Sequence, residues 1–286
     1  MKNIYLDQMI YSYLTQDKNK FGFSIEELGK RLNGYNLLIS TANLYELAQL
    51  SSSLDRVITA LENCNILFLP LAYQIQDEQL TELIYKKHFN HLYKPLIACE
   101  YISQLFTFIK PIPTNIPFNS SLHDYIRIFS SKYLTSIRRQ TESVWLRHAR
   151  ELHRNKQSIP YKKVNEEGFR IRLKKFLSHL RDPSGKPIPQ LSHENIINDL
   201  IDHIENNPEI IPTIHIENLF FEFRYSNNSR KPDKNDPRDI EHIICGLTNS
   251  DYFVTCDTNM LNFCNYAKDK YEKLPDCRDN LDFLCV

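Results

Sequence analysis

Short apolar segments of strand length alternate with segments of helical period at both ends of the chain. The predicted strands are residues 3–6, 36–40, 65–69 and 252–255. The predicted helices are residues 24–33, 54–62 and 237–247, together with one that begins after Ser40 or Thr41 and carries Glu46. Strands and helices in alternation are typical of a parallel sheet with crossover helices. We therefore predict an α/β fold whose parallel sheet is built from both ends of the chain.

Two of the predicted helices begin with capping signals. Ser24, with Glu27 three residues later, forms a capping box, which satisfies backbone N–H groups at a helix start. Asp236 followed by Pro237 predicts an N-cap and a first helical residue. Asp239 is then the third residue of that helix, so an acidic side chain lies in its first turn.

The middle of the chain has a different pattern. From about residue 73 to residue 223 the apolar positions recur with helical period, interrupted by prolines at 111–117 and by the segment 182–187. Structureless loops of this length are uncommon in compact domains, so this part should pack as its own unit. The predicted organisation is a parallel α/β domain made of residues 1–70 and 225–286, with an α-helical insertion of residues 71–224.

Composition excludes several protein classes. The 286 residues are 42% hydrophobic with a formal net charge of zero, which indicates a globular protein rather than a disordered or uniformly polyanion-binding one. No long apolar run is present, which predicts neither a signal peptide nor a membrane span, and a cytoplasmic location. The seven cysteines include no Cys-x-x-Cys pair, so free thiols are expected rather than a zinc cage or a disulfide framework.

One segment of the predicted insertion is strongly basic. Residues 138–181 contain thirteen Lys or Arg and four Asp or Glu, a net charge of +9, and aromatic residues are interleaved at 145, 161, 169 and 176. Such a surface suits phosphates and stacked bases, although amphipathic helices with core-facing aromatics give the same pattern. The candidate nucleic-acid-binding residues are Arg138, Arg139, Arg147, Arg170, Arg172, Lys174 and Lys175.

Four carboxylates follow strand ends or lie in early helix turns. They are Asp7, Glu46, Asp239 and Asp257. In parallel α/β sheets, ligands bind in the crevice outside the carboxyl ends of the strands, which is where these side chains are expected to meet. Clustered carboxylates repel one another unless a hard divalent cation neutralises them. Taken singly, the same residues also suit an N-cap, a surface glutamate, compensation of a helix dipole and an Asx-turn, respectively.

These segments resemble the PIN-domain (PIN-like) family of metal-dependent nucleases. The resemblance is carried by Tyr5-Leu6-Asp7-Gln8, by Ser40 through Glu46-Leu47, by Asp239-Ile240-Glu241-His242, and by Phe253-Val254-Thr255-Cys256-Asp257. It covers roughly residues 1–70 and 230–286 and implies a Rossmann-like parallel fold. Two positions differ from the family, which often has Asn at the position of Met9 and a second Asp at that of Asn259; both differences weaken a second metal site.

The resemblance implies Mg²⁺- or Mn²⁺-dependent hydrolysis of phosphodiester bonds, by an endoribonuclease of the toxin or defence type. Asp7 and Asp257 are the expected direct or water-mediated metal ligands, while Glu46 and Asp239 complete the shell or orient water. The supporting residues around these ligands are Thr255, Asp236 and Asn259. RNA is the expected partner before DNA, and an inhibitory protein or a second copy of the chain is compatible with this class; no membrane partner is expected.

Three other functions are compatible with the sequence. Arg147 and His153 have the Arg-x5-His spacing of the HEPN family's metal-independent ribonuclease site. A catalytically silent PIN-like module could instead recruit a protein or RNA through the helical insertion. A structure-specific DNA nuclease would use the same metal chemistry and differ in the path of its substrate.

Overall fold

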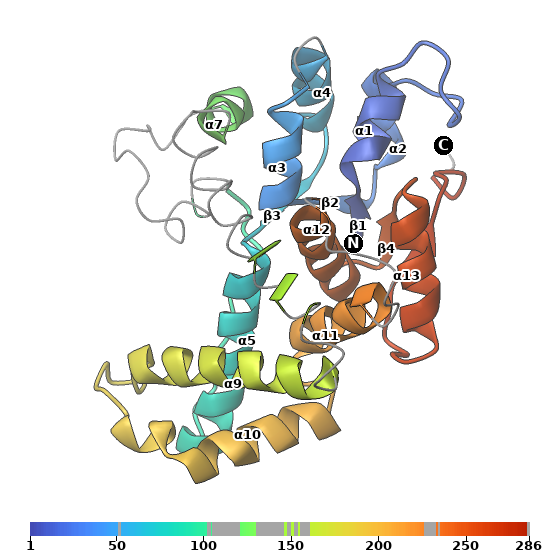
Figure 1. Cartoon of the computed structure of the whole chain (residues 1–286). Helices are drawn as coiled ribbons and strands as arrows, with labels where there is room; N and C mark the ends of the chain where they lie inside the picture. Colours follow the sequence, from blue (N-terminus) through green and yellow to red (C-terminus); the bar gives the residue numbers. More distant parts are fainter. Residues whose placement is uncertain are drawn as a thin grey trace. The chain divides into compact units, whose positions relative to one another are not determined.

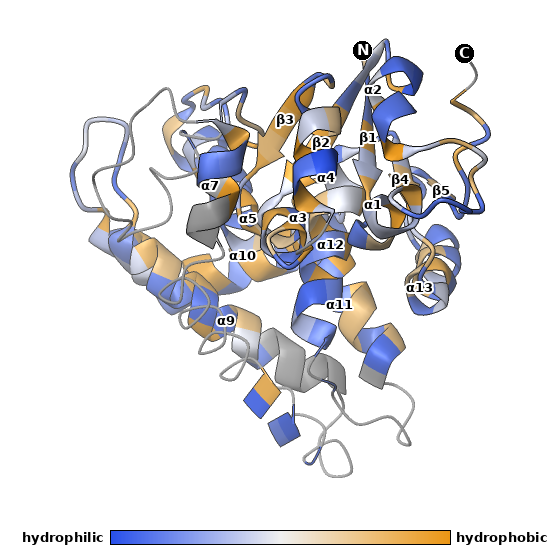
Figure 2. Ribbon diagram, turned by 90° about the horizontal axis from the view of Figure 1, so that it is seen from above, coloured by the Kyte–Doolittle hydropathy of each residue, from blue (hydrophilic) through white to orange (hydrophobic). Residues whose placement is uncertain are grey.

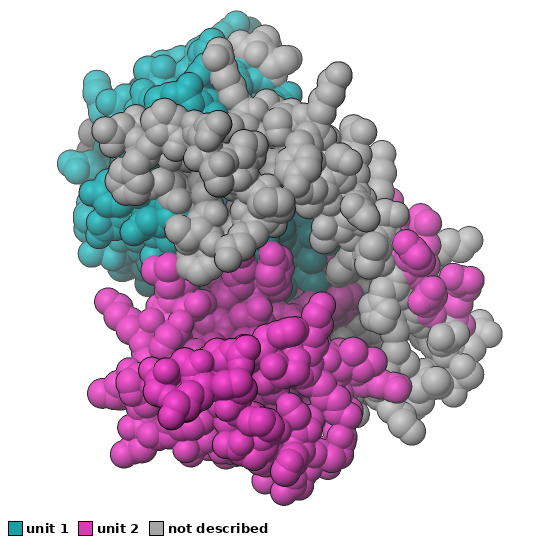
Figure 3. All heavy atoms as spheres, turned by 90° about the vertical axis from the view of Figure 1, so that its left-hand side faces the viewer, with its two compact units in different colours: residues 1–71, 97–144, 235–286 teal, residues 72–96, 145–234 magenta. Residues whose placement is uncertain are grey.

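The structure is a computed structural model that forms two compact units. It describes residues 1–50, 53–101, 104, 121–129, 146, 147, 150, 151, 154, 161–225, 233 and 235–284, without the side chains of residues 125, 127–129, 161–166 and 225. Unit 1 comprises residues 1–71, 97–144 and 235–286, and unit 2 comprises residues 72–96 and 145–234 (Figure 3).

Unit 1 contains a five-stranded, all-parallel sheet in the order β3-β2-β1-β4-β5 (Figure 1). Its strands are β1 (Lys2–Leu6), β2 (Tyr35–Ser40), β3 (Ile66–Leu69), β4 (Tyr252–Val254) and β5 (Asp276–Arg278). Strand β4 pairs with β1, Leu6 lying opposite Val254, so segments about 250 residues apart in the chain are neighbours. The structure therefore confirms the predicted parallel α/β fold built from both chain ends.

The predicted helices of unit 1 begin close to their predicted positions. The helices that the structure describes in this unit are α1 (Gln8–Leu14), α2 (Leu28–Arg31), α3 (Thr41–Leu47), α4 (Leu54–Leu61), α7 (Leu122–Phe129), α12 (Asp236–Asn249) and α13 (Thr258–Lys268), with the 3₁₀ turn η1 (Ile25–Glu27) before α2. The predicted capping box is present, because the Ser24 N–H donates to Glu27 Oε1 at 3.4 Å. At α3, the Ser40 hydroxyl accepts from the Asn43 N–H and caps the helix.

The predicted N-cap of α12 is wrong by one residue. The carbonyl of Asn235 accepts from the N–H groups of Arg238 (2.9 Å) and Asp239 (3.1 Å), which makes Asn235 the N-cap and Asp236 the first helical residue. Asp236 is nevertheless buried. Pro237 does not distinguish the two possibilities, because the first N–H groups of a helix have no partner within it and proline fits at either of its first two positions.

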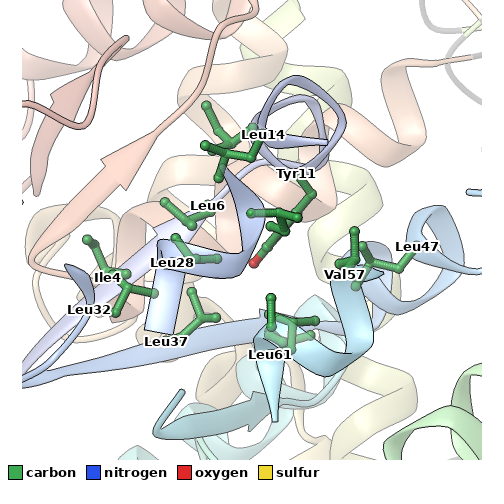
Figure 4. Packing of buried hydrophobic residues seen from close by; sticks show 14 of the residues in the cluster. Ile4, Leu6, Tyr11, Leu14, Leu28, Leu32, Leu37, Leu47, Val57 and Leu61 are labelled. Carbon is green, nitrogen blue, oxygen red and sulfur yellow. The ribbon is translucent and has the colours of Figure 1, made fainter. Parts of the chain in front are cut away.

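One face of the sheet carries the main hydrophobic core. Alternate strand residues point into it, as the two-residue period of a strand requires, and helices α1, α2 and α4 cover them. The buried residues from the strands are Ile4, Leu6, Leu37, Ile39, Phe68 and Val254. Figure 4 shows how Leu6 of β1 and Tyr11 of α1 lie near Leu28 and Leu61, which come from α2 and α4.

The opposite face packs against α12 at unusually short range. Tyr5 and Phe253 are opposite residues of β1 and β4, and their rings stack with centroids 5.7 Å apart. A Cβ atom added to Gly246 would lie 2.4 Å from Phe253 Cδ2 and 3.0 Å from Tyr5 Cδ1. The glycine therefore lets the backbone of α12 approach the sheet, which sets the position of every side chain on that helix.

Unit 2 is helical in the part that the structure describes. Its elements are α5 (Ala72–Phe89), α9 (Tyr161–His179), η2 (Pro189–Ser192), α10 (Glu194–Asn206) and α11 (Pro212–Tyr225). Hydrophobic and hydrophilic residues alternate along α9 and α10 (Figure 2). Their apolar residues form a separate core together with residues of α5 and α11; it includes Leu80, Leu173, Leu177, Ile197, Leu200 and Ile214.

The units divide the chain differently from the predicted insertion of residues 71–224. Residues 97–144 group with the sheet, since Cys99 forms an antiparallel bridge with Phe68 and α7 contacts α3 and α4. Helix α13 and strand β5 were not predicted: the polar sequence Asp276-Cys277-Arg278 lacks the apolar pattern of a strand. Among the described residues, no helix combines the length and apolar character needed to cross a membrane.

Replacing Gly246 with alanine tests the close approach of α12. We expect Gly246→Ala to lower the free energy of unfolding by about 3 kcal/mol, because the stacked ring of Phe253 cannot move away without disturbing Tyr5. Chemical denaturation measures this change. Asn262→Ala, at an exposed position of α13, is the control and should change stability little; equal stability of the two variants would contradict the packing described here.

Candidate metal centre

Three potential metal ligands converge in unit 1, at the carboxyl ends of the central strands. Asp7 directly follows β1, Glu46 lies on α3 after β2, and His242 lies on α12. One potential ligand atom from each residue lies within 4.8 Å of those of the other two. Two carboxylates predicted from the sequence are therefore adjacent, and a histidine joins them.

Asp7 is held in a buried position by backbone and side-chain contacts. Its N–H donates to the carbonyl of Val254 at 2.9 Å, and the Thr255 hydroxyl donates to its Oδ2 at 2.8 Å. It occupies the N-cap position of α1 but makes no capping hydrogen bond with its side chain. Burial raises the pKa of Asp7, against the opposing effects of the His242 charge and the Thr255 hydrogen bond. The free-energy cost of desolvating the carboxylate thus exceeds the stabilisation that its partners provide.

Glu46 and His242 form an ion pair beside Asp7. His242 Nε2 lies 2.8 Å from Glu46 Oε2, and the side chains of His242 and Glu46 are 2% and 17% exposed, respectively. Burial alone would lower the pKa of His242, but the charges of Glu46, Asp7 and Glu241 and the hydrogen bond from Glu46 outweigh it and raise the pKa to about 9. The imidazolium therefore neutralises part of the negative charge at neutral pH.

A hydrogen-bond chain holds a proton on Nδ1 of His242, both in the imidazolium and in the neutral ring. Asn43 Nδ2 donates to the Leu6 carbonyl (3.0 Å), so its Oδ1 accepts from the N–H (3.0 Å) and hydroxyl (3.1 Å) of Ser40. Ser40 Oγ can then accept from the Tyr5 hydroxyl (2.7 Å), and the Tyr5 oxygen accepts from His242 Nδ1 (2.7 Å). The chain places a proton on Nδ1 and directs Nε2 to the carboxylates.

A further carboxylate ties α3 to α12. The Thr41 hydroxyl donates to Glu241 Oε1 at 2.5 Å, one residue before His242. This charge-assisted hydrogen bond fixes the start of α3 against α12, so Glu46 and His242 are carried by two helices with their own connection.

The other two predicted acids have different surroundings. Asp257 is the N-cap of α13, where Oδ1 accepts from the N–H groups of Asn259 (2.6 Å) and Met260 (3.1 Å). Asp239 lies in the first turn of α12. Within the part of the chain that the structure describes, neither belongs to the group of close ligand atoms formed by Asp7, Glu46 and His242.

His242 is the functional candidate that the sequence reading did not select. It appeared only within the Asp239-to-His242 segment of the family resemblance. One signal was available in the sequence, because His242 lies three residues after Asp239 and hence on the same side of the predicted helix. The structure adds that His242 lies four residues before Gly246, which faces the sheet, and this spacing directs the imidazole inward.

Most of the basic candidates in unit 2 that the structure describes already have acidic partners. Arg170 and Lys174 each lie 2.7 Å from Glu194, and Arg172 lies 3.5 Å from Asp77 and 3.7 Å from Glu217. Phe169 and Phe176 pack against the core of this unit, which is the amphipathic-helix interpretation of the aromatic pattern.

Three basic candidates are exposed, and others cannot be placed. The exposed ones are Arg147, Lys174 and Lys175, of which Lys174 pairs with Glu194. Arg138, Arg139, Trp145 and His153 lie outside the described residues, as does the side chain of Tyr161. The Arg-x5-His hypothesis therefore stays a prediction.

The three ligand side chains fit a divalent cation. Two carboxylates and one imidazole are common ligands of divalent metals, and the desolvated charge of Asp7 favours an added positive charge. No protein-family model matches this chain, and no curated protein or solved structure shows significant similarity to it.

The metal-free protein should lose stability as the pH rises. His242 has a folded-state pKa of about 9 against an ordinary value of 6.5, so its contribution is fully present below pH 6.5 and is lost as the pH rises through 9. In EDTA, the free energy of unfolding of the wild type should fall by up to about 3 kcal/mol more than that of His242→Gln as the pH rises from 6.5 through 9. Denaturation at several pH values measures it. His179→Gln, at an exposed position, should behave as the wild type; parallel curves for wild type and His242→Gln would contradict the ion pair.

Proposed function

We propose that this chain is a divalent-metal-dependent nuclease with a PIN-like fold, and specifically an endoribonuclease. The observation that carries the proposal is the convergence of Asp7, Glu46 and His242 at the carboxyl edge of a parallel sheet. This is the edge at which open α/β sheets bind ligands. The RNA substrate and the toxin or defence setting rest on the family resemblance.

The proposed site assigns separate tasks to its residues. Asp7 and Glu46 would hold the cation, which supplies Lewis-acid chemistry for phosphodiester hydrolysis when bound. Thr255 restrains one oxygen of Asp7 through its 2.8 Å hydrogen bond and so leaves the other to face the cation. Asp239 in the first turn of α12 and Asp257 at the N-cap of α13 would orient water.

Two observations support a contribution from Asp239 and Asp257 in addition to Asp7 and Glu46. Asp239 precedes His242 by three residues on α12, so both lie on one side of that helix. Asp257 follows β4, whose neighbour β1 leads into Asp7. Mg²⁺ and Mn²⁺ are the cations implied by the resemblance.

Removing the charge of Asp7 should abolish hydrolysis and spare the fold. We expect Asp7→Asn to reduce metal-dependent cleavage of labelled RNA by at least about 100-fold, because asparagine keeps the volume and the Thr255 contact but loses a ligand charge. In EDTA the variant should be more stable than the wild type, since burial raises the pKa of Asp7. Cleavage assays with Mg²⁺, Mn²⁺ or EDTA, on RNA and DNA, measure the first effect and denaturation the second.

Asp17→Asn, at an exposed position of unit 1, is the matched control and should keep wild-type activity. Cleavage that survives both EDTA and Asp7→Asn would overturn the metal mechanism and favour the Arg147-His153 site. Metal-loaded protein that binds RNA without cutting RNA or DNA would favour the silent binding module. Cleavage of DNA alone would favour the structure-specific DNA nuclease.

The exposed basic residues provide the test of nucleic-acid binding. If they contact phosphates, Arg147→Glu with Lys175→Glu should weaken RNA binding, and the slope of log affinity against log salt should flatten by about 0.7 per lost contact. Binding titrations at several salt concentrations measure this. Lys18→Glu, exposed in unit 1, is the control. An unchanged salt slope would remove these two residues from the proposed interface.

A further inference from the structure

We infer that His242 is a direct nitrogen ligand of the bound cation and that the site therefore prefers a transition-metal ion such as Mn²⁺ to Mg²⁺. The inference rests on the metal site of the proposed function and not on its nuclease activity. It starts from geometry: a ring nitrogen of His242 and one oxygen each of Asp7 and Glu46 lie within 4.8 Å of one another, and Nε2 of His242 lies 2.8 Å from Glu46 Oε2.

The hydrogen bond of His242 Nδ1 orients the imidazole for metal binding through Nε2. A metal-binding histidine almost always donates its second ring N–H to a fixed acceptor, which sets the tautomer and the ring orientation. Here Nδ1 lies 2.7 Å from the Tyr5 hydroxyl, and Tyr5 lies 2.7 Å from Ser40 Oγ. The acceptor is itself fixed, because Tyr5 is fully buried and stacked on Phe253.

The nitrogen that remains, Nε2, faces the carboxylate of Glu46. Nε2 lies 2.8 Å from Glu46 Oε2, and Asp7 is the third member of the group. A cation bound here would take the place of the Nε2 proton, which would leave to solvent. His242 and Glu46, now an ion pair, would then both hold the cation, and no further side chain would have to move into the site.

The mixed set of ligands decides the metal preference. Mg²⁺ is bound through oxygen and keeps several waters, whereas imidazole nitrogen favours first-row transition metals. With only Asp7 and Glu46 as ligands, the site would be open to Mg²⁺. A third ligand that is a buried, pre-oriented nitrogen shifts the relative affinity towards Mn²⁺.

The test is the spectrum of Mn²⁺ bound to the EDTA-treated full chain. Electron spin echo envelope modulation detects ¹⁴N coupled to bound Mn²⁺, and the free-ion signal gives its dissociation constant. We expect ¹⁴N modulation in the wild type and none in His242→Gln, with Mn²⁺ binding weakened roughly tenfold or more and Mg²⁺ binding changed less than about threefold. Tyr5→Phe, which keeps the imidazole but removes its acceptor, should retain the modulation and bind Mn²⁺ roughly tenfold more weakly.

Bound Mn²⁺ without ¹⁴N modulation in the wild type would overturn the inference, and this result does not depend on how any variant folds. Modulation that persists in a folded His242→Gln protein, judged by circular dichroism, would also overturn it. Nuclease activity decides the proposed function separately. Modulation without cleavage of RNA or DNA supports the ligand assignment and counts against the nuclease, whereas cleavage without modulation does the reverse.

Discussion

The arrangement of the candidate metal centre depends on the burial of Asp7 at the end of β1. A carboxylate placed there is desolvated, and it persists only because Thr255 donates a hydrogen bond and His242 supplies an opposing charge. These partners come from the segment after β4 and from α12, so the requirement to compensate one charge links the first strand to the last third of the chain. Replacing Asp7 with an apolar residue would remove that requirement, which is why the charge indicates function rather than stability.

The polar chain from Asn43 to His242 fixes β1, α3 and α12 in one relative arrangement. Each hydroxyl in it accepts from one neighbour and donates to the next, from the Leu6 carbonyl outwards. Such a network has few alternative arrangements, because any shift leaves a buried donor or acceptor without a partner. Gly246 restricts the arrangement further through packing, since it fixes the distance of α12 from the strands. The hydrogen-bond network and this close packing together preorganise the imidazole of His242.

Local sequence patterns predicted much of this structure. The remaining elements depend on contacts between residues distant in sequence, which such patterns do not encode. Strands β1, β2, β3 and β4 and the starts of α3 and α4 follow from apolar runs and capping residues, which act over a few positions. Strand β5 has no such pattern: Asp276 and Arg278 pair with β4 because its edge is available, and that is a tertiary effect. The pairing of Arg172 with Asp77 and Glu217 could not be predicted from the sequence either, because charges distant in sequence become partners only once the helices pack. For the same reason Asp7 and Glu46 could be selected singly, but their meeting with His242 could not.

The pairing of β4 with β1 has a consequence for synthesis of the protein. Everything up to residue 235 can leave the ribosome before the partner strand, the imidazole of His242 and the hydroxyl of Thr255 exist. During that time Asp7 has no buried position, and the sheet has an open edge along β1. The site is therefore completed only after α12 and β4 have been synthesised, and a chain released before residue 236 carries the first two carboxylates without the ability to assemble the centre around them. The order of the strands thus delays assembly of the centre until β4, which follows β2 by about 200 residues, is available to pair with β1.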